Sequence, residues 1–321
     1  LTDDEISTLE RATEEAFMQL GAAVGDYKTI IKKVAAISAE IAEDSANKEA
    51  AALLQWLEKS HFTYLGFRKV PINGKATDKL GVFRGHLTGA SEELIENHCE
   101  GNACEDPIIF TKWPEIAKVH RGVYPDCIVV NCYKDGELYA KAHLLGFFTY
   151  SVTQASPESI PWVRRKIKQV FKNAAIPDGT NAKRTLQRVI EGFPRDELFQ
   201  ATVEELTHNL LGVCQINERK QVRLYLRANP FGRFATALVY VPRDVYSTRV
   251  RIRIEKMLSE ALGSEAVEST TFFSESVLAR AYCVFKLPKD FDRQKINAVD
   301  INDLQQQIAE ITTGWLERLE V

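Results

Sequence analysis

The sequence has no long apolar run and no strong excess of either charge. Its longest apolar stretches, residues 128–130 and 144–148, are far shorter than the roughly 20 residues that cross a bilayer. Its formal net charge is −3, whereas proteins that bind nucleic acid usually carry a strong basic excess. We therefore expect no membrane segment, no nucleic-acid partner and no membrane partner.

The sequence also lacks a disulfide framework and a secretion signal. Its 6 cysteines are spread singly along 321 residues, which predicts reduced thiols. No basic segment followed by an apolar core stands near residue 1. These features predict a cytoplasmic location. The chain begins with Leu1 and ends in a helical pattern without a tail, and we expect it to be a segment of a longer polypeptide.

The residue patterns of common active sites are missing as well. No Gly-x-Gly-x-x-Gly joins a strand to a helix, and no Gly-x-Ser-x-Gly or His-Glu-x-x-His occurs. His98, Cys99 and Cys104 are the nearest group to a zinc site, but no fourth ligand is identifiable, which favours a polar loop with free thiols. We expect no catalytic residue, no metal and no cofactor in this chain.

The length predicts two or three domains, and the patterns divide the chain into four parts. Residues 1–59 have apolar residues at helical spacing, with a break at Gly25-Asp26. Residues 60–155 are mostly β, with a helical insertion near residues 91–99, and suggest a PAS- or GAF-like antiparallel sheet of five strands. A first strand at 61–70 is followed by five further ranges with strand character, 80–84, 108–112, 116–121, 127–133 and 138–152.

The second half of the chain reads as a helical connector followed by a compact α+β unit. In the connector, residues 156–218, Ser156-Pro157 and the capping box Thr202-Val-Glu-Glu205 mark helix starts. Residues 219–321 contain a β-α-β-β-α order, which is most of a ferredoxin-like unit, the plan of ACT domains. Its closing strand is either absent or replaced by a strand at 221–228. The fold class is therefore α+β.

Six residues are candidates for an effector site or an interface. Arg195-Asp196 and Arg243-Asp244 each follow a proline between two regular elements. There an arginine can bind a carboxylate across a domain interface, or the aspartate can cap the next helix. His120 and Arg121 lie in a range with strand character, where they bind a carboxylate ligand if they face the concave side of the sheet, or form a structural pair.

Five motifs, in order, resemble the N-terminal regulatory portion of the large NAD-specific glutamate dehydrogenases. They are residues 54–68, 119–128, 156–167, 193–200 and 231–244. In that family, ACT-like and PAS-like modules precede a helical region and the catalytic domain. The resemblance implies a parent enzyme that uses NAD to deaminate L-glutamate to 2-oxoglutarate and ammonium. The family's catalytic lysines, glycine-rich loop and Rossmann domain have no counterpart here.

The favoured hypothesis is a non-catalytic regulatory and oligomerisation segment of an NAD-dependent glutamate dehydrogenase. Its expected partners are the remainder of the same polypeptide, further copies in a homo-oligomer, and amino-acid effectors. The alternative is a free-standing ligand- or partner-binding protein with PAS-like and ACT-like domains. In ACT domains an effector lies near the turn after the first strand, here residues 241–244. We expect the isolated chain to bind amino acids weakly or not at all, with Arg243 in an inter-domain contact.

Overall fold

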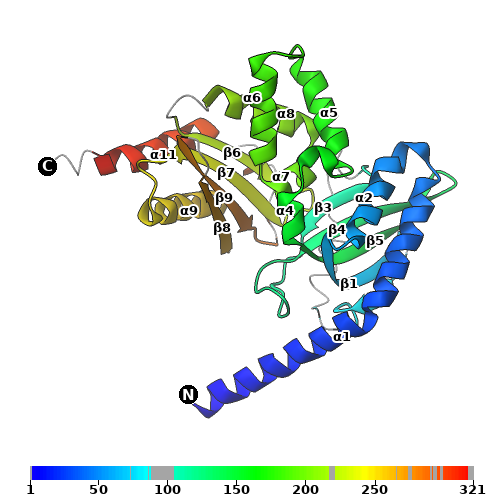
Figure 1. Cartoon of the computed structure of the whole chain (residues 1–321). Coiled ribbons are helices and arrows are strands. Elements are labelled where there is room, and N and C mark those ends of the chain that lie inside the picture. Colours follow the sequence, from blue (N-terminus) through cyan, green and yellow to red (C-terminus); the bar gives the residue numbers. More distant parts are fainter. Residues whose placement is uncertain are drawn as a thin grey trace. The chain divides into compact units, whose positions relative to one another are not determined.

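The chain forms two compact units, residues 1–167 and 168–321 (Figure 1). The computed structural model describes residues 2–72, 74–85, 87, 105–216, 221–264, 266–273, 277–289, 291, 295–296 and 299–316. The expected helical insertion near residues 91–99 and the cysteine–histidine group at 98–104 lie outside these residues. The four-part division of the sequence stays a prediction.

The first unit begins with one long helix, α1 (Asp3–Ala42). A capping box starts it, because the Thr2 side chain accepts from the Glu5 amide while the Glu5 carboxylate accepts from the Thr2 amide. The predicted break at Gly25-Asp26 is wrong. A glycine inside a helix costs only about 1 kcal/mol, and the Asp26 carboxylate holds the helix at this point by accepting from the Gly81 amide and pairing with Arg84.

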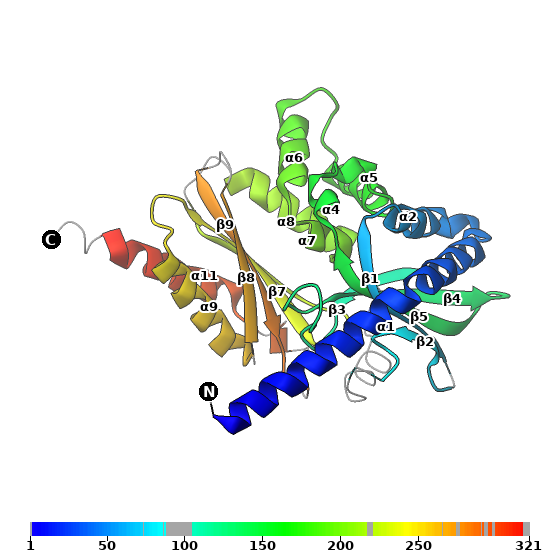
Figure 2. The same ribbon diagram turned by 60° about the horizontal axis from the view of Figure 1, so that its bottom comes forward.

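The second half of α1 packs on a five-stranded antiparallel sheet, and η1 (Ser45–Asn47) and α2 (Lys48–Glu58) contact α1. The strands are β1 (Phe62–Pro71), β2 (Thr77–Gly81), β3 (Ile108–Lys112), β4 (Asp126–Lys134) and β5 (Glu137–Phe148). Their order is β2-β1-β5-β4-β3, and all neighbours are antiparallel. Figure 2 shows α1 running past this sheet. The expected five-stranded antiparallel sheet is confirmed.

Three segments of this unit differ from the predicted strands. Residues 113–125 form a loop between β3 and β4, because the Arg121 amide donates to the Val119 carbonyl around His120, whose φ is +70°. β2 ends at Gly81, which has φ +62° and no room for a Cβ atom. The end of the last predicted strand instead begins a short helix, α4 (Tyr150–Gln154).

A run of short helices follows. It consists of η3 (Pro157–Ser159), α5 (Val163–Ala174), α6 (Asn181–Gly192), α7 (Arg195–Gln200) and α8 (Val203–Ile216). The predicted capping box opens α8: the Thr202 amide donates to Glu205 at 2.8 Å and the Glu205 amide donates to the Thr202 hydroxyl at 3.2 Å. Ser156 precedes η3 but makes no side-chain capping bond there. The predicted helical connector is confirmed.

The second unit contains a four-stranded sheet. Its elements are β6 (Arg223–Ala228), β7 (Phe234–Pro242), α9 (Thr248–Leu262), β8 (Ala266–Phe273), β9 (Leu278–Lys286) and α11 (Ile301–Leu316). The strand order is β6-β7-β9-β8, and all neighbours are antiparallel. β6 therefore lies beside β7, where the closing strand of a ferredoxin-like unit belongs. The closing strand is replaced by β6, although β6 comes first in the chain.

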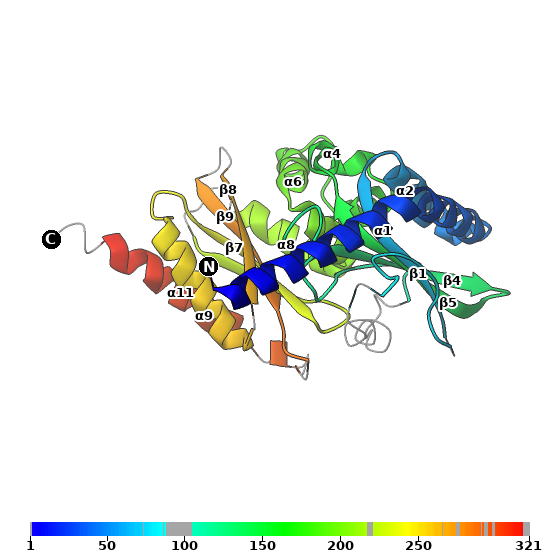
Figure 3. The ribbon, with the colours of Figure 1, turned by 90° about the horizontal axis from the view of Figure 1, so that it is seen from below.

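Helices cover both faces of this sheet. On one face, Val250, Ile254 and Leu258 of α9 and Leu304 and Ile308 of α11 join the inward residues of the strands in one apolar core. On the other face, Gly212 of α8 lies so close to Tyr225 that an added Cβ atom would stand 2.2 Å from the Tyr225 hydroxyl. Figure 3 shows α9 and α11 side by side. The result is a three-layer unit in which polar side chains on the second face are buried as well.

Candidate functional site

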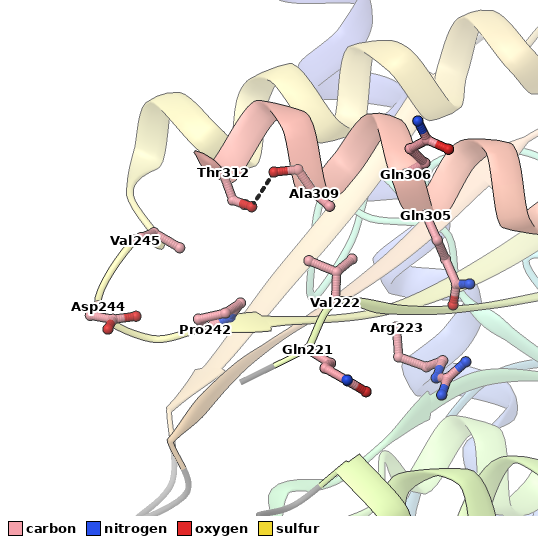
Figure 4. Close-up of a pocket in the computed structure, with 10 residues that line it drawn as sticks. All are labelled: Gln221, Val222, Arg223, Pro242, Asp244, Val245, Gln305, Gln306, Ala309 and Thr312. Atoms are coloured by element: carbon pink, nitrogen blue, oxygen red, sulfur yellow. Dashed lines mark hydrogen bonds between the residues drawn. The ribbon is translucent and has the colours of Figure 1, made fainter. Parts of the chain in front are cut away.

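The second unit contains a cleft of about 540 Å³ between the start of β6, the β7–α9 turn and α11 (Figure 4). It includes part of the turn that the sequence predicts as an effector site. The residues that line it are Gln221, Val222, Arg223, Pro242, Asp244, Val245, Gln305, Gln306, Ala309 and Thr312.

The cleft has an apolar wall, and two of its polar residues, Gln305 and Thr312, are hydrogen-bonded. Side chains alternate along β6, so Val222 points toward α11 whereas Arg223 points to the opposite side (Figure 4). Gln305 reaches from α11 to β6 and accepts from the Leu224 amide at 2.9 Å. Thr312 donates to the Ala309 carbonyl at 2.6 Å. The cleft therefore combines an apolar wall with an acidic residue, Asp244, at one end.

Arg243 and Asp244 diverge from each other. Asp244 lines the cleft, whereas the Arg243 guanidinium lies 5.6 Å from the centre of the Phe273 ring. The interpretation of Asp244 as the cap of α9 is wrong, because Ser247 directly precedes the helix and its hydroxyl accepts from the Val250 amide at 3.3 Å. The turn is thus long enough to separate Asp244 from the helix that follows it.

Arg195 and Asp196 lie in the first turn of α7. The residue that precedes this helix is Pro194, which has no capping side chain, so Asp196 is not its N-cap. Arg195 donates to the carbonyls of Glu191 and Phe193, both at 3.0 Å, and thereby covers the end of α6. The acidic group of Asp196 is favourable at the N-terminus of α7 because of the helix dipole. These contacts join two helices of one unit.

His120 and Arg121 lie on the loop between β3 and β4, not on a strand. Both are exposed and meet at one buried ring, that of Phe147 on β5. The His120 ring centre is 5.5 Å from that of Phe147, and the Arg121 guanidinium is 5.8 Å from it. The two side chains therefore cover an aromatic residue of the sheet in this structure.

A buried ion pair of the second unit was missed in the sequence. Arg227 of β6 donates to both carboxylate oxygens of Glu197 on α7, at 3.1 and 2.8 Å, and to Gln200 at 3.1 Å. The Tyr282 hydroxyl also donates to Glu197, at 3.2 Å. The sequence carried no local signal for this pair, because Arg227 alternates with apolar residues as an exposed side chain would.

Electrostatics explains why this buried network stays charged. Burial alone would raise the pKa of Glu197, but the Arg227 guanidinium and the hydrogen bonds from Thr236 and Tyr282 outweigh it, so this pKa lies below the usual 4.5. Arg227 loses solvation on burial, yet the Glu197 carboxylate raises the pKa of its guanidinium. The pair therefore stays ionised at neutral pH, and it fixes α7 to the four-stranded sheet.

The described residues provide no metal centre and no reactive thiol. No group of three or more histidine, cysteine, aspartate or glutamate side chains that would hold a metal ion occurs among them. Burial raises the pKa of Cys127 and that of Cys283 to about 12, so both are protonated at neutral pH. In the same part of the chain, none of the helices has the length and apolar character needed to span a bilayer.

Two family models match this chain in consecutive order. Residues 160–219 match glutamate dehydrogenase, helical motif 1, and residues 223–316 match glutamate dehydrogenase, ACT2 domain. The second match covers the four-stranded sheet with its helices α9 and α11. By class, the second half of the chain therefore matches two modules of glutamate dehydrogenases.

Curated relatives extend the match to almost the whole chain. The NAD-specific glutamate dehydrogenases of Halomonas elongata, Pseudomonas aeruginosa and Mycobacterium tuberculosis are 33, 30 and 25% identical to it over 98, 97 and 98% of its length. The chain spans only 20 to 21% of these relatives. The resemblance found in the sequence is confirmed: the chain matches a segment of the large NAD-specific glutamate dehydrogenases that carries helical motif 1 and the ACT2 domain.

Proposed function

We propose that this chain is a non-catalytic regulatory and assembly segment of a cytoplasmic NAD-dependent glutamate dehydrogenase. In the parent enzyme, NAD would accept electrons from L-glutamate, with 2-oxoglutarate and ammonium as products. The observation that carries the proposal is the ordered match to helical motif 1 and the ACT2 domain in a chain that spans about a fifth of its relatives. Its partners are the remainder of the polypeptide and further copies of it.

The fold of the second unit supports a regulatory role. The Glu197–Arg227 pair fixes the helical connector to one face of the sheet, and α9 and α11 cover the other face. A ligand in the cleft touches β6, the β7–α9 turn and α11 at once. A ligand that changes the distance between α11 and β6 would therefore act directly on β6, the strand that carries Arg227.

The first test concerns catalysis. The isolated 321-residue chain is expected to show no glutamate-dependent reduction of NAD, whereas the full-length parent enzyme, assayed in parallel, is expected to turn over. Turnover by the isolated chain would contradict the proposal. A gene that ends soon after Val321 would instead favour the free-standing binding protein.

The second test concerns effectors. We propose that an amino acid with an apolar side chain binds the cleft in the parent enzyme, with its ammonium group near Asp244. Ala309→Phe fills the cleft and is expected to abolish the response of the parent's activity to a panel of amino acids. Arg243→Ala is the matched control, because Arg243 lies outside the cleft. A response that survives Ala309→Phe and disappears in Arg243→Ala would reject the cleft. The isolated chain should bind the same amino acids weakly or not at all by calorimetry.

A further inference from the structure

From Ile6 to Tyr27, α1 carries an apolar stripe that is largely exposed in the described chain, and its last member, Tyr27, lies 6.4 Å from the Tyr64 ring. The second half of the helix buries residues such as Ile30 and Val34 against its own unit. The stripe consists of six side chains that are 37 to 68% exposed, and Phe17 and Val24 are the most exposed of them. Its members are Ile6, Leu9, Phe17, Leu20, Val24 and Tyr27.

The spacing of this stripe is that of a two-stranded coiled coil. From Ile6 to Tyr27, with Thr13 included, the steps average about 3.5 residues, which is the period that keeps a seam facing a partner helix. At about 100° per residue the side chains fall within roughly 80° of the helix circumference. The exposed Met18 lies on the opposite side. The stripe therefore has the form of a helix-pairing seam.

The charges that flank the seam select the orientation of the partner. On one flank the N-terminal half carries Asp3, Glu10 and Glu14, and the next turns carry Lys28 and Lys32. All five are exposed, and within the described chain none of them has an ion-pair partner. In an antiparallel pair each flank faces itself in reverse, so the acids meet the lysines. A parallel pair would bring the acidic halves together.

We propose that α1 pairs in antiparallel fashion with α1 of a second copy of this chain, about a two-fold axis near Phe17. The seam extends over about 32 Å of each helix. Since the same surface serves both copies, the interface is isologous and closed. The acidic N-terminal turns of each helix then lie beside Lys28 and Lys32 of the other.

The stripe itself is tested by sedimentation of the 321-residue chain over micromolar to submillimolar concentrations. A concentration-dependent dimer is expected, and Phe17→Glu/Val24→Glu should weaken it at least tenfold. Met18→Glu, on the opposite side of the helix, is the matched control and should leave the dimer unchanged. Because these side chains are exposed, circular dichroism should show the same helix content in all variants. A chain that stays monomeric throughout, or a dimer that survives the double substitution, overturns the proposal.

The orientation is tested by exchanging charges. Lys28→Glu/Lys32→Glu should weaken the dimer, and the addition of Asp3→Lys/Glu10→Lys to the same chain should restore it. An oxidised Phe17→Cys chain should form a covalent dimer, whereas Arg11→Cys, on the far side of the helix, should not exceed the unsubstituted chain. Failure of the fourfold exchange to restore association overturns the antiparallel arrangement, as does a crosslink through residue 11 alone.

Discussion

Each unit has a buried arginine on a strand of its sheet, and the groups that surround the arginine differ between the two units. In the first unit, Arg68 of β1 donates from Nε to Nδ1 of His143 at 3.0 Å, and its guanidinium lies 5.0 and 5.4 Å from the rings of Phe83 and Trp113. In the second unit, Arg227 forms a bidentate ion pair with Glu197. The Arg68 guanidinium thus contacts two aromatic rings and an imidazole, whereas the Arg227 guanidinium contacts a carboxylate.

In both units a nearby positive charge lowers the pKa of the neighbouring group, but the effect on the charge of that group is opposite. Burial, together with the positive charges of Arg68 and Lys141, holds the pKa of His143 well below 6.5. His143 is therefore neutral at neutral pH, and because Nδ1 accepts from Arg68 its proton resides on Nε2. Arg227 also lowers the pKa of its neighbour, but there it keeps Glu197 charged. Burial and nearby positive charge keep the imidazole neutral, whereas the contact with Arg227 keeps the carboxylate ionised.

The largest expected effect comes from breaking the ion pair of the second unit. Arg227→Met leaves the buried Glu197 carboxylate without its counterion and should lower the free energy of unfolding by about 3–5 kcal/mol. Denaturant titration with hydrogen-exchange mass spectrometry locates the loss. Protection of β7 and β9 should fall, while protection of β1 and β5 is kept.

The matched control for this prediction is the double substitution Arg227→Met/Glu197→Leu. It removes both charges, so it should recover most of the stability that the single substitution loses. A single variant that loses less than about 1 kcal/mol would mean that water or a rearranged side chain replaces the guanidinium. A double variant as unstable as the single one would assign the cost to packing instead.

The next effect is a difference between the units in their response to acid. The pKa of His143 is lowered in the folded chain, so its contribution to stability is complete above pH 6.5 and is lost as the pH falls through the folded value. Each pH unit costs about 1.4 kcal/mol over that interval. Glu197, also lowered, contributes fully above pH 4.5 and loses stability only below it. Between pH 6.5 and 4.5, protection factors should fall in β5 and hold in β7.

His143→Gln is the control for the acid response, because glutamine still offers an oxygen to Arg68 and does not titrate. This variant should lose the dependence of β5 protection on pH in that interval. An equal loss of protection in β5 and β7 of the unsubstituted chain would contradict the proposed difference between the two arginines.

Local signals predicted much of the fold because they act within one turn of the chain. Thr202 and Glu205 lie three residues apart and make the capping box that the sequence indicates. Gly263 ends α9 with φ +58°, a left-handed conformation that glycine adopts readily. Alternation alone failed at residues 116–121, where the tight turn at His120 replaces a strand.

Long-range pairing was not predictable in the same way. That β6 completes the sheet depends on its pairing with β7, which no local pattern specifies. Arg227 alternates with apolar residues like an exposed side chain, and its burial follows only from the covering helices α7 and α8. The candidates Arg195 and Asp196 were next to the buried Glu197, yet their sequence did not distinguish an exposed carboxylate from an enclosed one.

The smallest expected effect distinguishes the contribution of Arg227 to the charge of Glu197 from that of the hydrogen bonds to its carboxylate. Tyr282→Phe removes a hydroxyl that donates to the Glu197 carboxylate at 3.2 Å, which should cost about 1 kcal/mol. It also removes one of the groups that lower the pKa of Glu197, so the acid-induced loss of β7 protection should begin at a higher pH. Tyr225→Phe is the matched control, because the buried Tyr225 hydroxyl has no hydrogen-bond partner in the described chain. If the two variants behave alike, the arginine alone holds the carboxylate in its charged form. If only Tyr282→Phe raises the pH at which β7 protection begins to fall, the charge of Glu197 depends on the whole network, unlike the neutral state of His143.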